Sequence, residues 1–135
     1  MDDQLAKVNR RLQRSVALGH ESHIRGELTD VFMECSQANW DGFNALPVSL
    51  ESFQLAQRFL LALPLGTAAP SIGAVPDGQI TMEWYAGPRR SLTICFDPAG
   101  HLHFAALAGP SRCCGTELLG DSVPETILKL IQRVS

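Results

Sequence analysis

The amino-acid sequence predicts one α+β domain, in which an antiparallel sheet of three to four strands is covered on one face by helices and preceded by an N-terminal helical hairpin. Apolar residues recur every three or four positions in residues 1–63 and again in residues 122–134, whereas they alternate with polar residues in residues 78–119. The chain of 135 residues is long enough for a single core. Helices, then hairpin-linked strands, then a last helix are typical of such a domain.

The N-terminal part predicts two amphipathic helices. The first apolar stripe runs from residue 3 to about residue 18, and Gly19 is placed to end that helix; its members are Leu5, Val8, Leu12 and Val16. The second stripe consists of Ile24, Leu28, Val31, Phe32 and Cys35. The two segments form either a hairpin or one long helix bent at Gly19.

A tight turn is predicted over the segment NWDGFNALP, residues 39–47, because asparagine, aspartate and glycine favour turns. Trp40 is unusual in such a segment. We expect its indole to lie over the core with the N–H bonded at the edge, and Phe43 and Leu46 to add to that contact. The alternative is a recognition loop, whose candidate contact residues are Trp40, Asp41 and Phe43.

A third helix is predicted after Ser49, whose side chain is suited to cap it, and Pro64 ends it. The residues expected to be buried are Phe53, Ala56, Phe59, Leu60 and Leu63. The next segment, residues 65–76, is small and interrupted by prolines, which predicts an extended connector.

Three segments with alternating apolar residues predict the strands of the sheet: QITMEWYA, SLTICFD and HLHFAALA. Since the apolar sets must face the same core, Phe96 is expected opposite Leu102 and Trp84 opposite Leu92. This register leaves residues 98–100 as a three-residue loop with glycine in the left-handed conformation. A short fourth strand is expected at residues 113–119.

The C-terminal segment DSVPETILKLIQRVS predicts a helix over residues 122–134. Asp121 or Ser122 caps it, and Pro124 is suited to its first turn. Its apolar face consists of Ile127, Leu128, Leu130, Ile131 and Val134.

The second face of the predicted sheet carries a mixed set of side chains. Thr81, Glu83, Tyr85 and Thr93 share this face with Cys95 and His103. Such a mixture is typical of a transient or homodimeric interface, and equally of an ordinary solvated face. We take the first four residues as a candidate interface.

The same face suggests a candidate metal site. The predicted register places Cys95 opposite His103 and Asp97 opposite His101, and these are residue types that bind zinc. The alternative is that the two histidines are solvated and the thiol packs as a small apolar group. No C-x-x-C or H-E-x-x-H pattern supports a metal, so no cofactor is expected and zinc is the alternative. A metal-dependent or thiol enzyme at these four residues is less expected than a binding function.

Composition and charge exclude other function classes. The formal net charge is −3 and the basic residues are scattered, so no basic surface for nucleic acid is expected. The charged first residues lack the apolar segment of a signal peptide, and no apolar run approaches the roughly 18 residues of a membrane span. We therefore expect a cytoplasmic protein without membrane contact, whose four cysteines are thiols.

Two motifs carry a resemblance to a known family. NWDGFNALP precedes a helix that ends in FLLALP, and PDGQITMEW opens the sheet. Over residues 39–103 the chain resembles a family of small, largely uncharacterised bacterial proteins with NWDG…LP and PDGxIxxEW motifs. The resemblance implies an α+β fold and a cytoplasmic bacterial protein, and such genes often accompany mobile or defence-related regions.

The function expected from the sequence is therefore a small cytosolic protein-binding or regulatory module, accessory to a mobile-element or defence-linked operon. Its partner is expected to be another protein or a second copy of the chain in a homodimer. The alternatives are the enzyme described above and a self-assembling scaffold.

Overall fold

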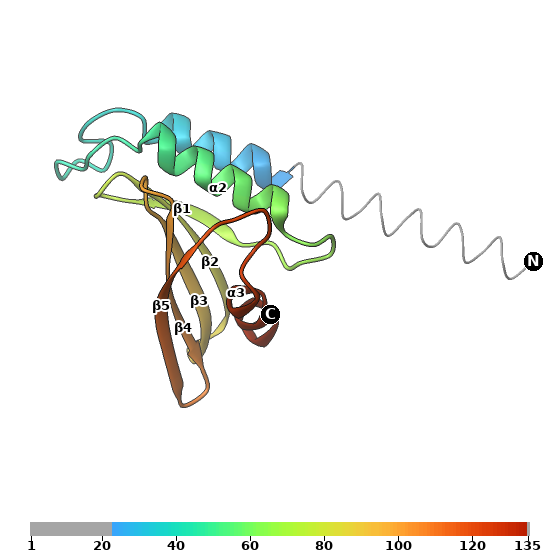
Figure 1. Cartoon of the computed structure of the whole chain (residues 1–135). Coiled ribbons are helices and arrows are strands. Elements are labelled where there is room, and N and C mark those ends of the chain that lie inside the picture. The colour runs from blue at the N-terminus through green and yellow to red at the C-terminus, as the bar shows by residue number, and fades with distance from the viewer. Residues whose placement is uncertain (1–22, 135) are drawn as a thin grey trace, which may run out of the picture.

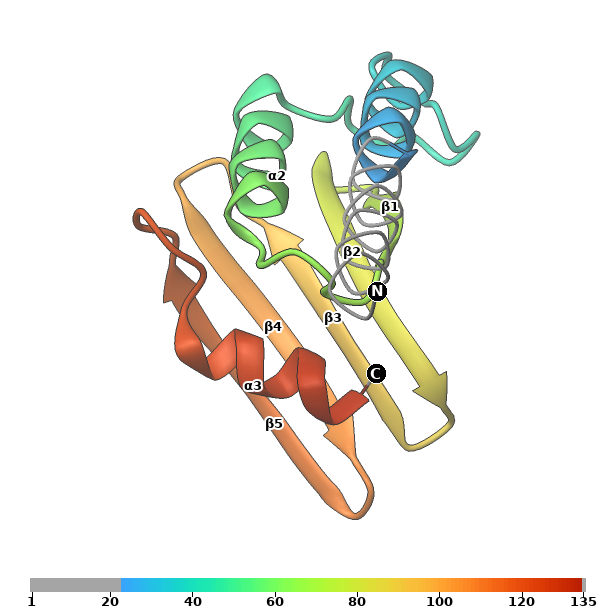
Figure 2. The same cartoon turned by 90° about the vertical axis from the view of Figure 1, so that its right-hand side faces the viewer.

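The computed structural model describes residues 23–134, which form five antiparallel strands and three helices (Figure 1). The elements in chain order are a helix over residues 23–34, α2 (Leu50–Ala62), β1 (Ser71–Val75), β2 (Gln79–Gly87), β3 (Arg90–Phe96), β4 (His101–Ala108), β5 (Ser111–Leu118) and α3 (Glu125–Val134). The strands follow one another as a meander in the order β1-β2-β3-β4-β5. All three helices lie on the same face of the sheet, toward the viewer in Figure 2.

The predicted fold class is confirmed as α+β with an antiparallel sheet, but the predicted strand number is too small. The segment expected to be an extended connector contains β1, which pairs with β2 and sets Ile72 opposite Met82. Pro70 and Pro76 flank this strand, and prolines are tolerated at the ends of edge strands. The fourth predicted strand is β5. The first helix of the predicted hairpin lies outside the described residues.

The predicted register is confirmed. Trp84 lies opposite Leu92 and Phe96 opposite Leu102. The β3–β4 turn has Gly100 at φ 99°, and the Gly100 N–H donates to the Asp97 carbonyl at 2.9 Å. The β2–β3 turn consists of Pro88 and Arg89 and is tighter than a loop over AGPRR, residues 86–90, which the segments QITMEWYA and SLTICFD leave between them. It is tighter because β2 continues through an irregularity between Tyr85 and Gly87.

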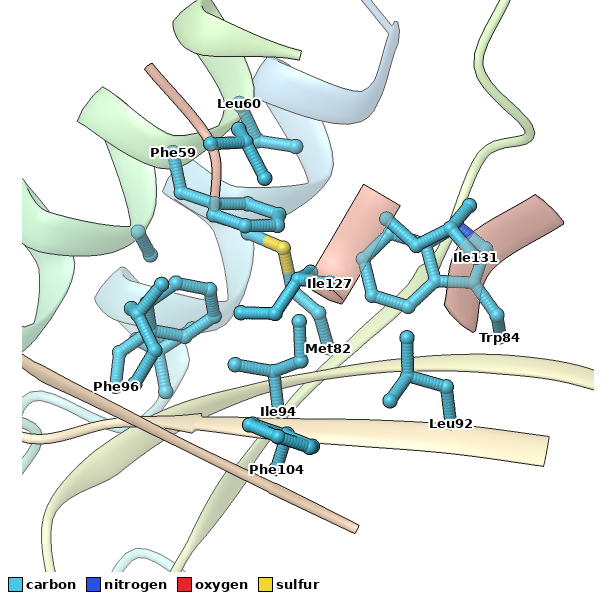
Figure 3. Packing of buried hydrophobic residues seen from close by; sticks show 14 of the residues in the cluster. Phe59, Leu60, Met82, Trp84, Leu92, Ile94, Phe96, Phe104, Ile127 and Ile131 are labelled. Atoms are coloured by element: carbon cyan, nitrogen blue, oxygen red, sulfur yellow. The ribbon is translucent and has the colours of Figure 1, made fainter. Parts of the chain in front are cut away.

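The core lies between the helices and the covered face of the sheet (Figure 3). Phe59 of α2 sits at its centre, with edge-to-face contacts to Trp84 and Phe96 at ring-centroid distances of 6.2 and 5.3 Å. Leu55 is buried as well, whereas Phe53 and Leu63, which were expected to be buried, are only half-buried. The predicted C-terminal helix is present, but it begins at Glu125 and not at residue 122. Its buried residues are Ile127, Leu130, Ile131 and Val134, and Leu128 is half-buried.

Two serines fix the first turn of α2. Ser49 caps the helix by accepting a hydrogen bond from the Ser52 N–H at 3.1 Å. The fully buried Ser52 hydroxyl donates to the Phe96 carbonyl at 2.6 Å and accepts from the Ile80 N–H at 2.8 Å. This hydroxyl therefore joins α2 to two strands at once.

Within residues 23–134 we find no helix that combines the length and apolarity of a membrane span.

Candidate interaction site: a self-bonded loop and an uncovered sheet face

The loop between the residue 23–34 helix and α2 is held by its own hydrogen bonds. The Asn39 N–H donates to the Ala45 carbonyl at 2.8 Å, and the Gly42 N–H donates to the Asn39 carbonyl at 3.1 Å. Asn39, Gly42 and Asn44 have positive φ angles of 63°, 78° and 65°. Asparagine and glycine tolerate this conformation better than other residues, which explains why the segment folds as a compact turn.

Two side chains complete this bonding. One oxygen of Asp41 accepts hydrogen bonds from the N–H groups of Phe43 at 2.8 Å and Ala45 at 3.1 Å. The Asn39 side-chain oxygen accepts from the Asn44 N–H at 2.7 Å. Such side-chain bonds to the nearby backbone replace water as partners of the turn. The candidate residue Asp41 therefore shapes the loop.

Trp40 fixes the loop to the rest of the protein, as the sequence predicts. It is half-buried against the core, and its indole N–H donates to the Leu46 carbonyl at 2.7 Å. The expectation that Phe43 and Leu46 add to this contact is wrong, because their exposed fractions are 86% and 59%. Phe43 points outward because Asp41 holds its backbone at the tip of the turn.

The far end of the loop is anchored to the β1–β2 turn. The Leu46 N–H donates to the Pro76 carbonyl at 2.8 Å, and the Ser49 N–H donates to the Gly78 carbonyl at 3.0 Å. In Figure 1 the loop extends past this end of the sheet, away from the side on which α3 lies. Phe43 is thus displayed from a segment that is fixed at both ends.

The second face of the sheet carries no other element of residues 23–134 (Figures 1 and 2). The pairing brings the four candidate interface residues together: Thr81 and Glu83 on β2 alternate with Trp84, Tyr85 follows on the same face, and Thr93 lies opposite Glu83. Tyr85 is 65% exposed and Glu83 is exposed. The predicted shared face is therefore what the structure has.

Two of the four candidate metal ligands, Asp97 and His103, belong to a hydrogen-bonded chain of side chains. His103 Nε2 lies 3.0 Å from Asp97 Oδ2, and His103 Nδ1 lies 2.9 Å from Thr116 Oγ1 on β5. The rings of His101 and His103 are stacked at 6.0 Å between centroids. In residues 23–134, no three side chains of histidine, cysteine, aspartate or glutamate converge to hold a metal ion. Both ring nitrogens of His103 have hydrogen-bond partners, and zinc binding by Cys95, Asp97, His101 and His103 stays a prediction.

The surroundings of Asp97 and Cys95 shift the pKa values of both side chains. The hydrogen bond from the Ala99 N–H lowers the pKa of Asp97, and the bond from His103 lowers it further, so Asp97 is a carboxylate near neutral pH. Burial raises the pKa of the Cys95 thiol, and the nearby Asp77 carboxylate adds to this. A thiol with a raised pKa is a poor nucleophile, which argues against a thiol enzyme at Cys95.

Sequence reasoning missed two features of the surface. Thr116 was not recognised as the partner of His103, although the two-residue turn at Gly109–Pro110 fixes the register that places them opposite each other. It also missed a groove between β5 and α3, because its lining residues Lys129 and Arg133 are ordinary members of the polar helix face.

The chain was compared with models of protein families, with curated proteins and with solved structures, and none of them matches it.

Proposed function

We propose that the protein is a protein-binding module that contacts its partner through Phe43 and the uncovered face of the sheet. The observation that carries the proposal is an aromatic side chain, 86% exposed, on a loop whose backbone is bonded by Asn39, Asp41 and Trp40. Exposed aromatic residues dominate binding energies in many interfaces. A loop that is already ordered loses little conformational entropy on binding, which favours affinity.

The sheet face supports the same proposal. Tyr85 is 65% exposed, and Leu118 is 65% exposed at the end of β5 next to His101. Between them lie small and polar side chains of β2, β3 and β4, so the face combines apolar anchors with hydrogen-bonding groups. This combination is typical of interfaces that form and dissociate.

From the NWDG…LP and PDGxIxxEW motifs of residues 39–103 alone, we further propose a partner encoded in a mobile or defence-related region. In that setting the chain acts as a regulator or accessory factor in the cytoplasm. One rival proposal is a self-assembling scaffold, in which the same surfaces contact further copies. The other is a metal-dependent or thiol enzyme centred on Cys95, Asp97, His101 and His103. The raised pKa of Cys95 and the occupied nitrogens of His103 support the binding module over the enzyme.

The test is affinity purification of the tagged full chain from its native cells, followed by measurement of the affinity for the recovered partner. We expect Phe43→Ser to weaken binding by at least about tenfold, because a central aromatic anchor is lost. Leu61→Ser is the matched control, since Leu61 is a 60% exposed apolar side chain on α2.

Equal binding by the Phe43→Ser and Leu61→Ser variants would overturn the proposal for the loop. Sedimentation of the purified chain tests the scaffold alternative. Assemblies that form with the parent chain and are lost in the Phe43→Ser variant would identify the partner as further copies of the same chain. Thermal unfolding of both variants should match that of the parent chain, because both side chains are exposed.

A further inference from the structure

β5 is an edge strand without cover on either face. It has eight residues, contains no proline, and pairs with β4 alone in residues 23–134. Every residue of β5 is exposed except Glu117, which is half-buried. A long exposed edge presents unpaired backbone groups to which a further strand can bind.

The hydrogen-bonding pattern identifies which groups of β5 point outward. The Asp97 N–H donates to the His101 carbonyl, so the odd-numbered residues of β4 bond to β3 and the even-numbered ones face β5. Ala108 is therefore bonded to Ser111 across the Gly109–Pro110 turn. Along β5 the backbone groups of Arg112, Cys114 and Thr116 then face away from the sheet.

A groove of about 510 Å³ lies between Cys113 of β5 and α3. It is on the face of the sheet that α3 covers, which is toward the viewer in Figure 2. Its lining consists of Cys113 from β5 and of Thr126, Lys129, Leu130, Gln132 and Arg133 from α3. A strand added outside β5 would lie about 4.8 Å from it, and every second side chain of that strand would point toward the groove side.

The charged side chains that line the groove are both positive. Lys129 lies 3.4 Å from Glu125, but both side chains are more than 70% exposed, so this ion pair is weak. No carboxylate of the described chain lies within ion-pair distance of the Arg133 guanidinium. Arg90 approaches the same end of α3 and donates to the Arg133 carbonyl at 2.6 Å. Lys129, Arg133 and Arg90 therefore make this end of the α3 face positive in a protein of net charge −3. The acidic residue of β5 on the same face, Glu117, lies toward the other end of the strand.

We propose that β5 and the groove together bind an extended acidic peptide segment of a partner protein. The segment adds to the sheet as a sixth strand through the outward backbone groups of β5. Its acidic side chains point to the groove side, where Lys129 and Arg133 attract them. Its other side chains point to the uncovered face of the sheet. This site uses the edge of β5 and the α3 face, whereas the function proposed above uses Phe43 and the uncovered face, so the proposal does not rest on that function.

A second copy of the chain fits this edge less well. In antiparallel pairing of two β5 strands, residues that lie opposite each other share a face of the sheet. The charged residues of β5 are Arg112, on the uncovered face, and Glu117, on the α3 face. These two cannot meet across such a dimer, so the strand is not complementary to itself in charge.

The test uses the full chain, under reducing conditions, and a fluorescent peptide as long as β5 that alternates valine with glutamate. The control peptide alternates valine with lysine. Fluorescence anisotropy should show at least about tenfold tighter binding of the glutamate peptide, and added salt should reduce the difference. Lys129→Gln with Arg133→Gln should abolish the preference. The matched control is Arg25→Gln with Arg58→Gln, which removes two exposed positive charges from the residue 23–34 helix and α2.

Amide exchange measured by NMR gives the second readout. In the complex the amides of Arg112, Cys114 and Thr116 should exchange more slowly, while that of Cys113, already bonded to β4, should change little. Absence of binding, equal binding of both peptides, or protection confined to β2 and β3 would each overturn the proposal. Protection of β5 that grows with protein concentration and is not displaced by the glutamate peptide would identify a second copy as the occupant, which also overturns it.

Discussion

The two edges of the sheet are built in opposite ways. β1 is a strand of five residues between Pro70 and Pro76, and the segments on both sides of it are bonded to other parts of the fold. The Trp84 indole donates to the Ala68 carbonyl at 2.7 Å, and the Leu46 N–H donates to the Pro76 carbonyl at 2.8 Å. β5 is a strand of eight residues with both faces exposed.

This difference leads us to expect that the β1 edge contributes to stability and that the β5 edge contributes to binding. On the β1 side, the flanking prolines keep the strand short, and the Ala68 and Pro76 carbonyls beside it are already hydrogen-bonded within the fold. On the β5 side, the backbone is available to another chain. We therefore expect substitutions on the β1 side to lower the free energy of unfolding, and substitutions on the β5 side to leave it nearly unchanged while altering binding.

A substitution at Gly78, in the β1–β2 turn, should give the largest loss in the free energy of unfolding. It has φ +86°, and a Cβ placed on it would lie 2.7 Å from the Pro47 carbonyl oxygen. Gly78→Val is expected to lower the free energy of unfolding by about 4 kcal/mol, because the backbone strain and the contact with the loop add. Chemical denaturation measures it.

Gly100→Val is the matched control for this substitution. Gly100 also has a positive φ, of 99°, but a Cβ placed on it would have no neighbouring atom within 4 Å among the described residues. The control should therefore cost about 2 kcal/mol, from backbone strain alone. Equal losses at the two glycines would show that the loop does not press on the β1–β2 turn.

Ser52 should give the second largest loss. Ser52→Ala leaves the buried Ile80 N–H and Phe96 carbonyl without the hydroxyl that joins them, which should lower the free energy of unfolding by about 3 kcal/mol. The helix cap Ser49 provides the comparison, since Ser49→Ala is expected to cost about 1 kcal/mol. If Ser52→Ala cost no more than Ser49→Ala, the join between α2 and the sheet would contribute little to stability.

Trp40 and Phe43 test the contrast within a single loop. Trp40→Ala removes a half-buried indole and its bond to the Leu46 carbonyl, and should lower the free energy of unfolding by about 2 kcal/mol. Phe43→Ala should change it by less than about 0.5 kcal/mol, because the ring is exposed. Thermal melts of the two variants measure the difference. A large loss for Phe43→Ala would mean that the ring supports the fold rather than a partner.

The sequence predicts the central strands well because their register depends on local signals. Alternation places Trp84 and Leu92 on one face, and Gly100 fixes the β3–β4 turn. β1 could not be recognised in the same way, since Gly73 and Ala74 carry little apolar signal and the flanking prolines suggest a connector. Its formation depends on pairing with β2, which is a long-range interaction.

The candidate site was predicted in part. The shared face of Thr81, Glu83 and Thr93 follows from period two alone. The outward direction of Phe43 could not be predicted, because it is set by the Asp41 side chain bonding to particular backbone groups of the turn. The groove beside β5 depends on where α3 lies over the sheet, and no local pattern in the sequence records that position.

The smallest expected effect concerns the chain of bonds from Asp97 through His103 to Thr116, which links the β3–β4 turn to the open edge. The pKa of Asp97 is lowered in the folded protein, so its carboxylate contributes stability above the ordinary value of 3.8 and loses that contribution as the pH falls through the lowered pKa. Asp97→Asn should therefore cost less than about 1 kcal/mol at neutral pH, since the side chain is partly exposed. The difference in the free energy of unfolding between the parent chain and the Asp97→Asn variant should become smaller in acid.

Urea denaturation of both proteins at neutral pH and well below pH 3.8 measures this dependence. Thr116→Val is the companion variant, because it removes the link to β5 but leaves the ionisable pair intact. Its effect should be the same at both pH values. If instead Asp97→Asn were equally destabilising at both pH values, Asp97 would contribute through its shape and hydrogen bonding alone. Its negative charge would then not stabilise the link from the β3–β4 turn to β5.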